Sequence, residues 1–294
     1  MCTAISYFGA RHYFGRNLDL DRSWGESVTV TPRRFPFRFR RAGEMPVHHA
    51  MIGMAAVEDG YPLYFEATNE QGLSMAGLNF PVSARYFPPA SGKDNIAPFE
   101  LIPWLLGRCA TVGEARPLLA RLHLVHIDFR PDLPLSPLHW ILSDARESVV
   151  IESTHLGLRC YDAPLGVLSN EPPHPQLPCP DARAAALPGD WSSTARYRRA
   201  IYVKQHMAVQ TEGPGPFFHL LDSVAVPRGP VRTDAGCCHF TRYSSCCDTA
   251  AGIYYYTTYE NRSITALSLH SFDPEGDRLI CRPLRKEPEI RWEH

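Results

Sequence analysis

Residues 2–21 read CTAISYFGARHYFGRNLDLD. Two runs rich in aromatic and β-branched residues, residues 2–8 and residues 12–20, are separated by the three-residue segment Gly-Ala-Arg. Runs of this kind, joined by a short segment that contains glycine, predict a β-hairpin. The hairpin holds Cys2 at the start of a strand, where a small apolar residue would serve a purely structural role without a reactive thiol.

Cys2 follows the initiator methionine directly, so removal of Met1 would give it a free α-amine beside its thiol. An α-amine titrates at about 7.7–8.0 and accepts a proton near neutral pH, where a lysine does not. Nucleophile and base are then carried by one residue, as in N-terminal nucleophile catalysis. We therefore expect a mature chain of residues 2–294. The alternative is a frayed terminus whose identity matters little.

Polar residues that such a nucleophile requires follow in the sequence. Arg16 and Asp19 lie in FGRNLDLD, on the second strand of the predicted hairpin. A cation near a thiol favours the thiolate, and a carboxylate near an amine orients it. Asn79 in AGLNFP and Asn170 in GVLSNEP each end a predicted strand. Asparagine side chains are suitable oxyanion donors, although each one alone is also typical of a turn.

Composition indicates a globular protein without a membrane partner. The chain has 294 residues, of which 44% are hydrophobic, and this is enough for a substantial core. Its formal net charge of −1 supplies no field that would attract nucleic acid or acidic lipid. The start lacks the features of a signal peptide, and no apolar run approaches the roughly 18 residues that a spanning helix needs. We expect a cytoplasmic location.

Residues 33–41, RRFPFRFRR, contain five arginines, a composition that could indicate nucleic-acid binding. The alternation places three phenylalanines on one face, and Pro36 predicts a bent or edge strand. A groove that follows a phosphate backbone would show clustered excess charge, and the rest of the chain offers no other basic or aromatic platform. A solvated strand face is the better interpretation.

Nine cysteines lie at positions 2, 109, 160, 179, 237, 238, 246, 247 and 281. An odd number in a long chain without a secretory signal argues against a disulfide framework. The adjacent pairs 237–238 and 246–247 lack the spacing of structural zinc sites, and neighbouring side chains on a strand point apart. We therefore expect no metal site at these cysteines.

The order of elements predicts an α+β fold. Strand patterns extend to residue 80, two helices are expected in residues 97–124, and short strands follow from 138 to 170. The second of these helices begins near Thr111, with Glu114 at the spacing of a capping box. Later segments are expected as a proline-rich loop (171–190), a serine-capped helix (192–207), a short helix (214–224) and two strands joined at a turn near Asn261. No repeat or break divides the chain, so a single domain, residues 1–294, with a mostly antiparallel sheet is expected.

Seven segments, in order along nearly the whole chain, resemble the choloylglycine hydrolase family, which includes bile salt hydrolases and penicillin V acylases. They are MCTAI, YFGRNLDLDRSWGESVTVTPR, ATNEQGLSMAGLNFPVSARY, LHWILSDARESVVIE, GVLSNEP, LPGDWSSTARYRRA and YSSCCDTAAGIYYYTTYENRSITALSL. The resemblance implies a four-layer αββα sandwich, with two antiparallel sheets between helical layers. It also implies amide hydrolysis without a metal or organic cofactor.

The resemblance also implies residue roles. Cys2 is the nucleophile, Arg16 lies beside its thiol, and Asp19 holds the α-amine. Asn79 and Asn170 build the oxyanion site. The set is completed by the arginine that follows SSTA, Arg196.

Substrate and assembly follow from the same resemblance. Penicillin V acylases tend to place a tyrosine at the position of Asn79, so asparagine favours conjugated bile salts, with glycine or taurine released. Leu18, Ile127 and Phe129 are expected to line the substrate pocket together with Asn79. The alternative substrates are penicillin V and other N-acyl amides such as acyl-homoserine lactones. Another alternative is a catalytically silent, thiol-bearing binding protein that retains Met1. Relatives carry a longer loop that reaches across subunits in their tetramers, whereas the corresponding loop is short in this chain (171–190). A homo-oligomer, a dimer or a tetramer, is expected here.

Overall fold

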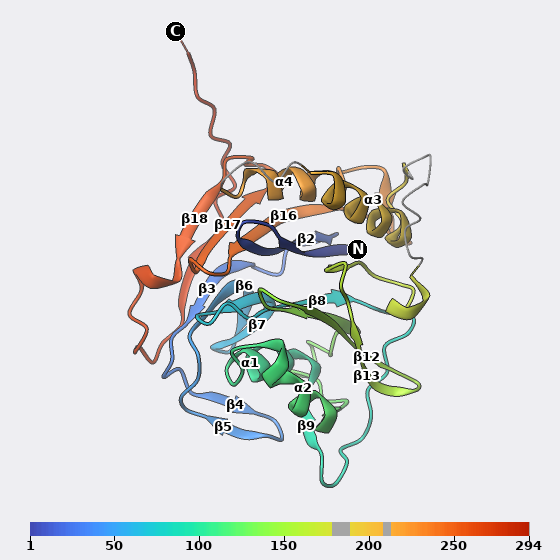
Figure 1. The fold of residues 1–294 in the computed structure, drawn as a ribbon, viewed down its shortest axis with the longest axis vertical. Coiled ribbons are helices and arrows are strands. Elements are labelled where there is room, and N and C mark those ends of the chain that lie inside the picture. The colour runs from blue at the N-terminus through green and yellow to red at the C-terminus, as the bar shows by residue number, and fades with distance from the viewer. Residues whose placement is uncertain (178–188, 208–212, 294) are drawn as a thin grey trace.

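The computed structural model describes residues 1–177, 189–207 and 213–293. Two β-sheets lie face to face, and a pair of helices covers the outer face of each (Figure 1). The helices are α1 (Leu101–Leu106), α2 (Val112–Arg121), α3 (Ser193–His206) and α4 (Gly215–Asp222). This arrangement confirms the predicted αββα sandwich.

The first sheet has seven strands and begins with the predicted hairpin. The two strands of this hairpin run antiparallel from residue 2, with Cys2 opposite Leu18 and Phe8 opposite His12. The strand order is β14-β1-β2-β16-β17-β18, and β15 pairs with β16. The strands are β1 (Cys2–Phe8), β2 (His12–Leu20), β14 (Val167–Leu168), β15 (Val231–Arg232), β16 (Cys238–Asp248), β17 (Ile253–Thr258) and β18 (Thr265–Ser268).

The second sheet has eight strands in the order β13-β12-β11-β8-β7-β6-β3-β19, and all its pairs are antiparallel. Its strands are β3 (Ser27–Thr31), β6 (Met51–Glu58), β7 (Tyr61–Asn69), β8 (Ser74–Asn79), β11 (Leu138–Ser143), β12 (Ser148–Thr154), β13 (Gly157–Asp162) and β19 (Ile280–Pro283). Two small pairs lie outside the sheets: β4 (Phe37–Phe39) with β5 (Gly43–Met45), and the parallel β9 (Asp94–Ile96) with β10 (Leu122–Leu124).

Three apolar clusters separate the four layers. One lies under α1 and α2, one under α3 and α4, and one between the sheets. Because side chains alternate along a strand, β16 contributes to two of them: Cys246 faces the helices and Cys247 faces the other sheet. This opposition confirms that the adjacent cysteines point apart. No cluster of three potential metal ligands forms in the described parts of the chain.

Local signals place the helix starts where the sequence predicts them. The Thr111 hydroxyl accepts a hydrogen bond from the Glu114 N–H, and the Ser192 hydroxyl accepts one from the Ala195 N–H. The strand expected in residues 33–41 is short. Arginines of this segment form ion pairs with glutamates, such as Arg33 with Glu70 and Arg38 with Glu44. Within the described ranges, no helix is long and apolar enough to cross a membrane. Part of the proline-rich loop, residues 178–188, lies outside the described residues.

Candidate active site

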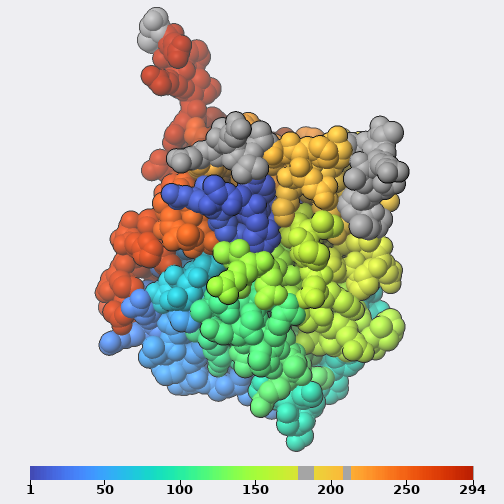
Figure 2. Space-filling model, in the orientation of Figure 1, coloured from blue at the N-terminus to red at the C-terminus, as the bar shows by residue number. Residues whose placement is uncertain are grey.

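Cys2 is the first residue of β1, and its side chain faces the layer between the sheets. It is 2% exposed and packs in the same cluster as Leu18. Met1 continues the strand pairing by one residue: its amino group donates to the Asp19 carbonyl at 3.0 Å, and the Asp19 N–H donates to the Met1 carbonyl at 3.1 Å. The peptide bond between Met1 and Cys2 therefore lies beside Asp19. In Figure 2 the blue N-terminal segment reaches the molecular surface.

Arg16 shares the layer of the Cys2 thiol because it lies two residues from Leu18 on β2. Its guanidinium is completely buried, and Nη1 donates to the carbonyls of Phe65 (3.0 Å) and Gly77 (2.6 Å). Burial alone would lower the pKa of Arg16, but the nearby Cys2 thiol, Tyr243 and Glu66 raise it above its usual range. A permanent cation is thus fixed beside the thiol.

Glu66 supplies the negative charge behind Arg16. Its Oε2 lies 3.9 Å from Arg16 Nε. Two tyrosine hydroxyls from the opposite sheet donate to the same carboxylate, Tyr243 to Oε2 at 2.8 Å and Tyr254 to Oε1 at 2.6 Å. Burial raises the pKa of Glu66, while Arg16 and the tyrosines oppose that rise. Glu66 could not be predicted from the sequence, because no local pattern distinguishes it from other strand residues.

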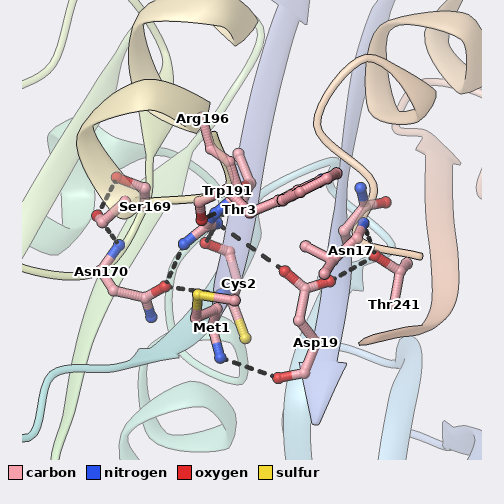
Figure 3. Close-up of polar contacts among 12 residues, drawn as sticks. Met1, Cys2, Thr3, Asn17, Asp19, Ser169, Asn170, Trp191, Arg196 and Thr241 are labelled. Carbon is pink, nitrogen blue, oxygen red and sulfur yellow. Dashed lines mark hydrogen bonds and ion pairs between the residues drawn. The ribbon is translucent and has the colours of Figure 1, made fainter. Parts of the chain in front are cut away.

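Arg196 of α3 joins the N-terminal strand to both Asn170 and Asp19 (Figure 3). Its Nη1 donates to the Cys2 carbonyl and to the Thr3 hydroxyl, and its Nη2 donates to Asn170 Oδ1 at 2.8 Å. Nη1 also lies 3.9 Å from Asp19 Oδ2. Burial lowers the pKa of Arg196, and Asp19 and Cys2 oppose this effect.

Asp19 is completely buried and only half of its carboxylate is bonded. Its Oδ1 accepts from the Thr241 hydroxyl at 2.6 Å. Among the described residues, Oδ2 accepts no hydrogen bond. A buried carboxylate oxygen without a donor is unfavourable, so Oδ2 is suited to a charged donor that the unprocessed chain does not present.

Asn170 and Asn79 meet at the edge of this network. Asn170 Oδ1 accepts from the Cys2 N–H at 2.7 Å, and its Nδ2 donates to the Asn79 carbonyl at 2.7 Å. Asn79 thus approaches through its main chain, while the residue itself is exposed. The structure therefore brings together all six residues that the sequence analysis singled out: Cys2, Arg16, Asp19, Asn79, Asn170 and Arg196.

The network also includes residues that the sequence analysis missed. The Thr3 hydroxyl accepts a hydrogen bond from Arg196, and the Thr241 hydroxyl donates one to Asp19. The Trp191 carbonyl accepts from Arg196 Nε at 3.1 Å. The Ser193 hydroxyl accepts from the Asn170 N–H at 2.9 Å. The segment LPGDWSSTARYRRA contains Trp191 and Ser193, so its likeness to the family was the available signal.

The expected pocket residues have separate locations. Leu18 is buried opposite Cys2, whereas Ile127 and Phe129 are half-buried in the segment before β11. The Phe129 ring packs against Tyr61 and Phe99, with centroids 6.0 and 5.3 Å apart. Two surface hollows lie elsewhere, one beside the end of α4 and one beside α2, and neither includes these residues. Substrate contact by Leu18, Ile127 and Phe129 stays a prediction.

Comparison with known proteins identifies the family. The model of the linear amide C-N hydrolases, choloylglycine hydrolase family, matches residues 2–177 and 180–280. The chain belongs to the choloylglycine hydrolase family. As a member, it is 42% identical to a bile salt hydrolase/transferase of Lactiplantibacillus plantarum, over 98% of both chains. It is 31% identical to a bile salt hydrolase/transferase of Clostridium perfringens, over 95% of both chains.

Solved structures show the same architecture. A mutant conjugated bile acid hydrolase from Clostridium perfringens superposes with a TM-score of 0.92, 29% identity and full coverage of both chains. A penicillin V acylase from Agrobacterium tumefaciens superposes with a TM-score of 0.77 at 19% identity, covering 95% of this chain and 90% of that one. The second likeness shows the choloylglycine hydrolase fold alone. Since this family hydrolyses linear amides, the network around Cys2 is the candidate active site of an amidohydrolase.

Proposed function

We propose that this protein hydrolyses the amide bond of conjugated bile salts, releasing a free bile acid and glycine or taurine. The observation that carries the proposal is that Arg16 lies beside the Cys2 thiol and Arg196 bonds to the Cys2 carbonyl, with Asp19 paired to Arg196, at the start of a buried strand. The names of relatives that match the chain over nearly its whole length supply the substrate class.

Removal of Met1 precedes catalysis in this account. It converts the Cys2 amide, whose N–H bonds to Asn170 Oδ1, into an α-amine. Asp19 Oδ2, which accepts no hydrogen bond in the described residues, is the acceptor that we assign to this amine. Asp19 then holds the amine, and Arg196, through its bond to the Cys2 carbonyl, fixes the orientation of the residue. The binding-protein alternative requires the opposite, a chain that keeps Met1.

Acylation begins when the α-amine takes the thiol proton and Cys2 Sγ attacks the amide carbonyl carbon. The carbonyl oxygen becomes an oxyanion, which accepts hydrogen bonds from the side-chain amide of Asn170 and from an N–H of Asn79. The intermediate collapses as the C–N bond breaks, and the α-ammonium gives its proton to the departing nitrogen of glycine or taurine. The bile acid is left as a thioester on Sγ.

Deacylation reverses the roles with water as the nucleophile. The α-amine takes a proton from water, the hydroxide attacks the thioester carbonyl, and the C–S bond breaks to release the free bile acid. The thiolate that leaves is stabilised by Arg16, whose guanidinium is held by the Phe65 and Gly77 carbonyls. Every proton is carried by Cys2 itself, so no other side chain has to act as the base.

The acidic turn Glu58-Asp59 lies close to the predicted pocket segment and is partly balanced there by Arg130, which also pairs with Asp132. Arg130 Nη1 lies 2.9 Å from Glu58 Oε2 and 3.2 Å from Asp59 Oδ2. The Asp59 side chain is 72% exposed, so its charge stays in water. These contacts leave the half-buried Phe129 available as an apolar surface for a steroid.

The test is turnover by Cys2→Ala protein and wild type on four substrates: glycocholate, taurocholate, penicillin V and an acyl-homoserine lactone. We expect the wild type to release glycine or taurine faster than it cleaves the other two, and we expect Cys2→Ala to release neither. Undiminished release by Cys2→Ala would overturn the mechanism. Faster cleavage of penicillin V would leave the mechanism intact and reverse the substrate assignment. The cytoplasmic location, the dimer or tetramer and the single domain stay predictions.

A further inference from the structure

A buried histidine–glutamate pair lies between the sheets, next to the two asparagines. His139 on β11 and Glu152 on β12 are completely buried, and His139 Nδ1 lies 3.1 Å from Glu152 Oε1. On its other side, His139 Nε2 lies 2.8 Å from the Ser169 carbonyl oxygen. A carbonyl only accepts, so Nε2 carries a proton and donates it to Ser169. The contact with Glu152 must then contain one further proton, on the imidazole or on the carboxyl.

The pair holds the segment that carries Asn170 at both of its ends. His139 bonds to the carbonyl of Ser169, the residue before Asn170. Glu152 Oε1 accepts from the His174 N–H at 2.9 Å. These two side chains therefore bond to the main chain at both ends of residues 169–174.

His139 also contacts the strand end that carries Asn79. Its ring stacks on Phe80, the residue after Asn79, with centroids 4.1 Å apart and planes 6° apart. Asn79 ends β8 of the eight-stranded sheet, whereas Asn170 follows β14 of the other sheet. One imidazole thus contacts a neighbour of each asparagine and spans the layer between the sheets.

We propose that His139 and Glu152 are positioning residues that set the separation of Asn79 and Asn170. The inference rests on the proposed function, because it assigns these asparagines to the oxyanion of the same reaction. Oxyanion donors stabilise the transition state only when they are preorganised, so a small shift of one sheet edge reduces turnover. In the described structure, His139 and Glu152 form no hydrogen bond or ion pair with Cys2 and are linked to it only through Asn170, whose Oδ1 accepts from the Cys2 N–H. A displaced oxyanion donor should therefore lower turnover far more than it changes the reactivity of the thiol.

The experiment compares His139→Phe and Glu152→Gln with a matched control, His48→Phe. His139→Phe retains a ring beside Phe80 and removes both hydrogen bonds. His48 is also a buried histidine, with its two nitrogens 2.7 and 2.9 Å from backbone carbonyls and its ring 4.8 Å from that of Phe37. Two quantities are measured: kcat and KM for glycocholate, and the rate at which iodoacetamide alkylates the Cys2-containing peptide. Alkylation forms no oxyanion and reports the thiol alone.

We expect kcat to fall about 100-fold in His139→Phe and about 10-fold in Glu152→Gln, with KM and the alkylation rate changed less than about threefold. His48→Phe should retain the wild-type kcat. Wild-type kcat in both variants, or an alkylation rate that falls as far as kcat, would overturn the proposal. If His139→Phe does not fold, Glu152→Gln decides the matter by the same criteria. Failure of the proposed function appears separately, as a wild type that releases no glycine, and the comparison is then made on whichever amide of the panel the wild type cleaves.

Discussion

Asp19 Oδ2 lies 3.9 Å from Arg196 Nη1, and both groups are completely buried. This distance is too long for a hydrogen bond, and within the described residues no other donor reaches Oδ2. The Met1–Cys2 peptide runs alongside Asp19 through two backbone hydrogen bonds. Loss of Met1 would turn the Cys2 nitrogen of this peptide into an α-ammonium, and we expect Asp19 Oδ2 to accept a hydrogen bond from it.

Substitution of Asp19 by asparagine tests this role with little change of shape. We expect Asp19→Asn to lower kcat for glycocholate by about 100-fold or more and to leave KM nearly unchanged, because the α-amine loses the charge that orients it. Thr241→Val is the matched control, since it removes only the hydroxyl bound to Oδ1, and a smaller loss is expected. Wild-type kcat in Asp19→Asn would contradict the role.

Substitutions of Arg16 and Glu66 distinguish an effect on stability from an effect on catalysis. Arg16→Met leaves Glu66 as an uncompensated buried carboxylate, so we expect the free energy of unfolding in urea to fall by about 3–5 kcal/mol. The double variant Arg16→Met/Glu66→Gln removes both charges and should recover most of that stability. Turnover should be lost in both variants, because the cation beside the thiol is absent from both. A double variant that regains turnover would show that Arg16 acts only in folding.

His12 predicts a pH dependence of stability. Its ring nitrogens bond to Ser6 Oγ (2.8 Å) and Thr249 Oγ1 (2.9 Å), and burial lowers its pKa from 6.5 to about 4. Between these two values the unfolded chain binds a proton that the folded chain does not, so stability falls as the pH falls. From pH 7 to pH 5 this amounts to about 2 kcal/mol. Urea unfolding at both pH values should show that His12→Gln loses about this much less stability than the wild type. An equal loss in both proteins would refute the assignment.

The sequence predicted the parts of the structure that depend on local order. The alternating runs around Gly9 are sufficient for the hairpin, and the hydroxyls of Thr111 and Ser192 are sufficient for two helix starts. The six candidate site residues followed from the chemistry that Cys2 needs and from the family likeness. Their convergence in one network confirms their proximity, while their roles stay proposals.

Contacts between the sheets were not predictable in the same way. Glu66 meets Tyr243 across 177 positions of the sequence, and His139 meets the Ser169 carbonyl across 30. No local sequence pattern identifies Glu66 or His139, because the burial of each side chain and the residue that it contacts depend on how one sheet packs on the other. The side chain of Asn79 was assigned to the site, but the contact that the structure shows is its main-chain carbonyl. The periodicity of a strand predicts which face of the sheet a side chain lies on. Only the packed structure shows which atoms are in contact.

The most direct test of the central claim is the intact mass of an active preparation, measured on the sample whose glycine release from glycocholate has just been recorded. We predict the mass of residues 2–294, with a free Cys2 amine and no Met1. An active preparation whose mass still includes Met1 would contradict the account, because its Cys2 nitrogen would be an amide unable to accept the thiol proton.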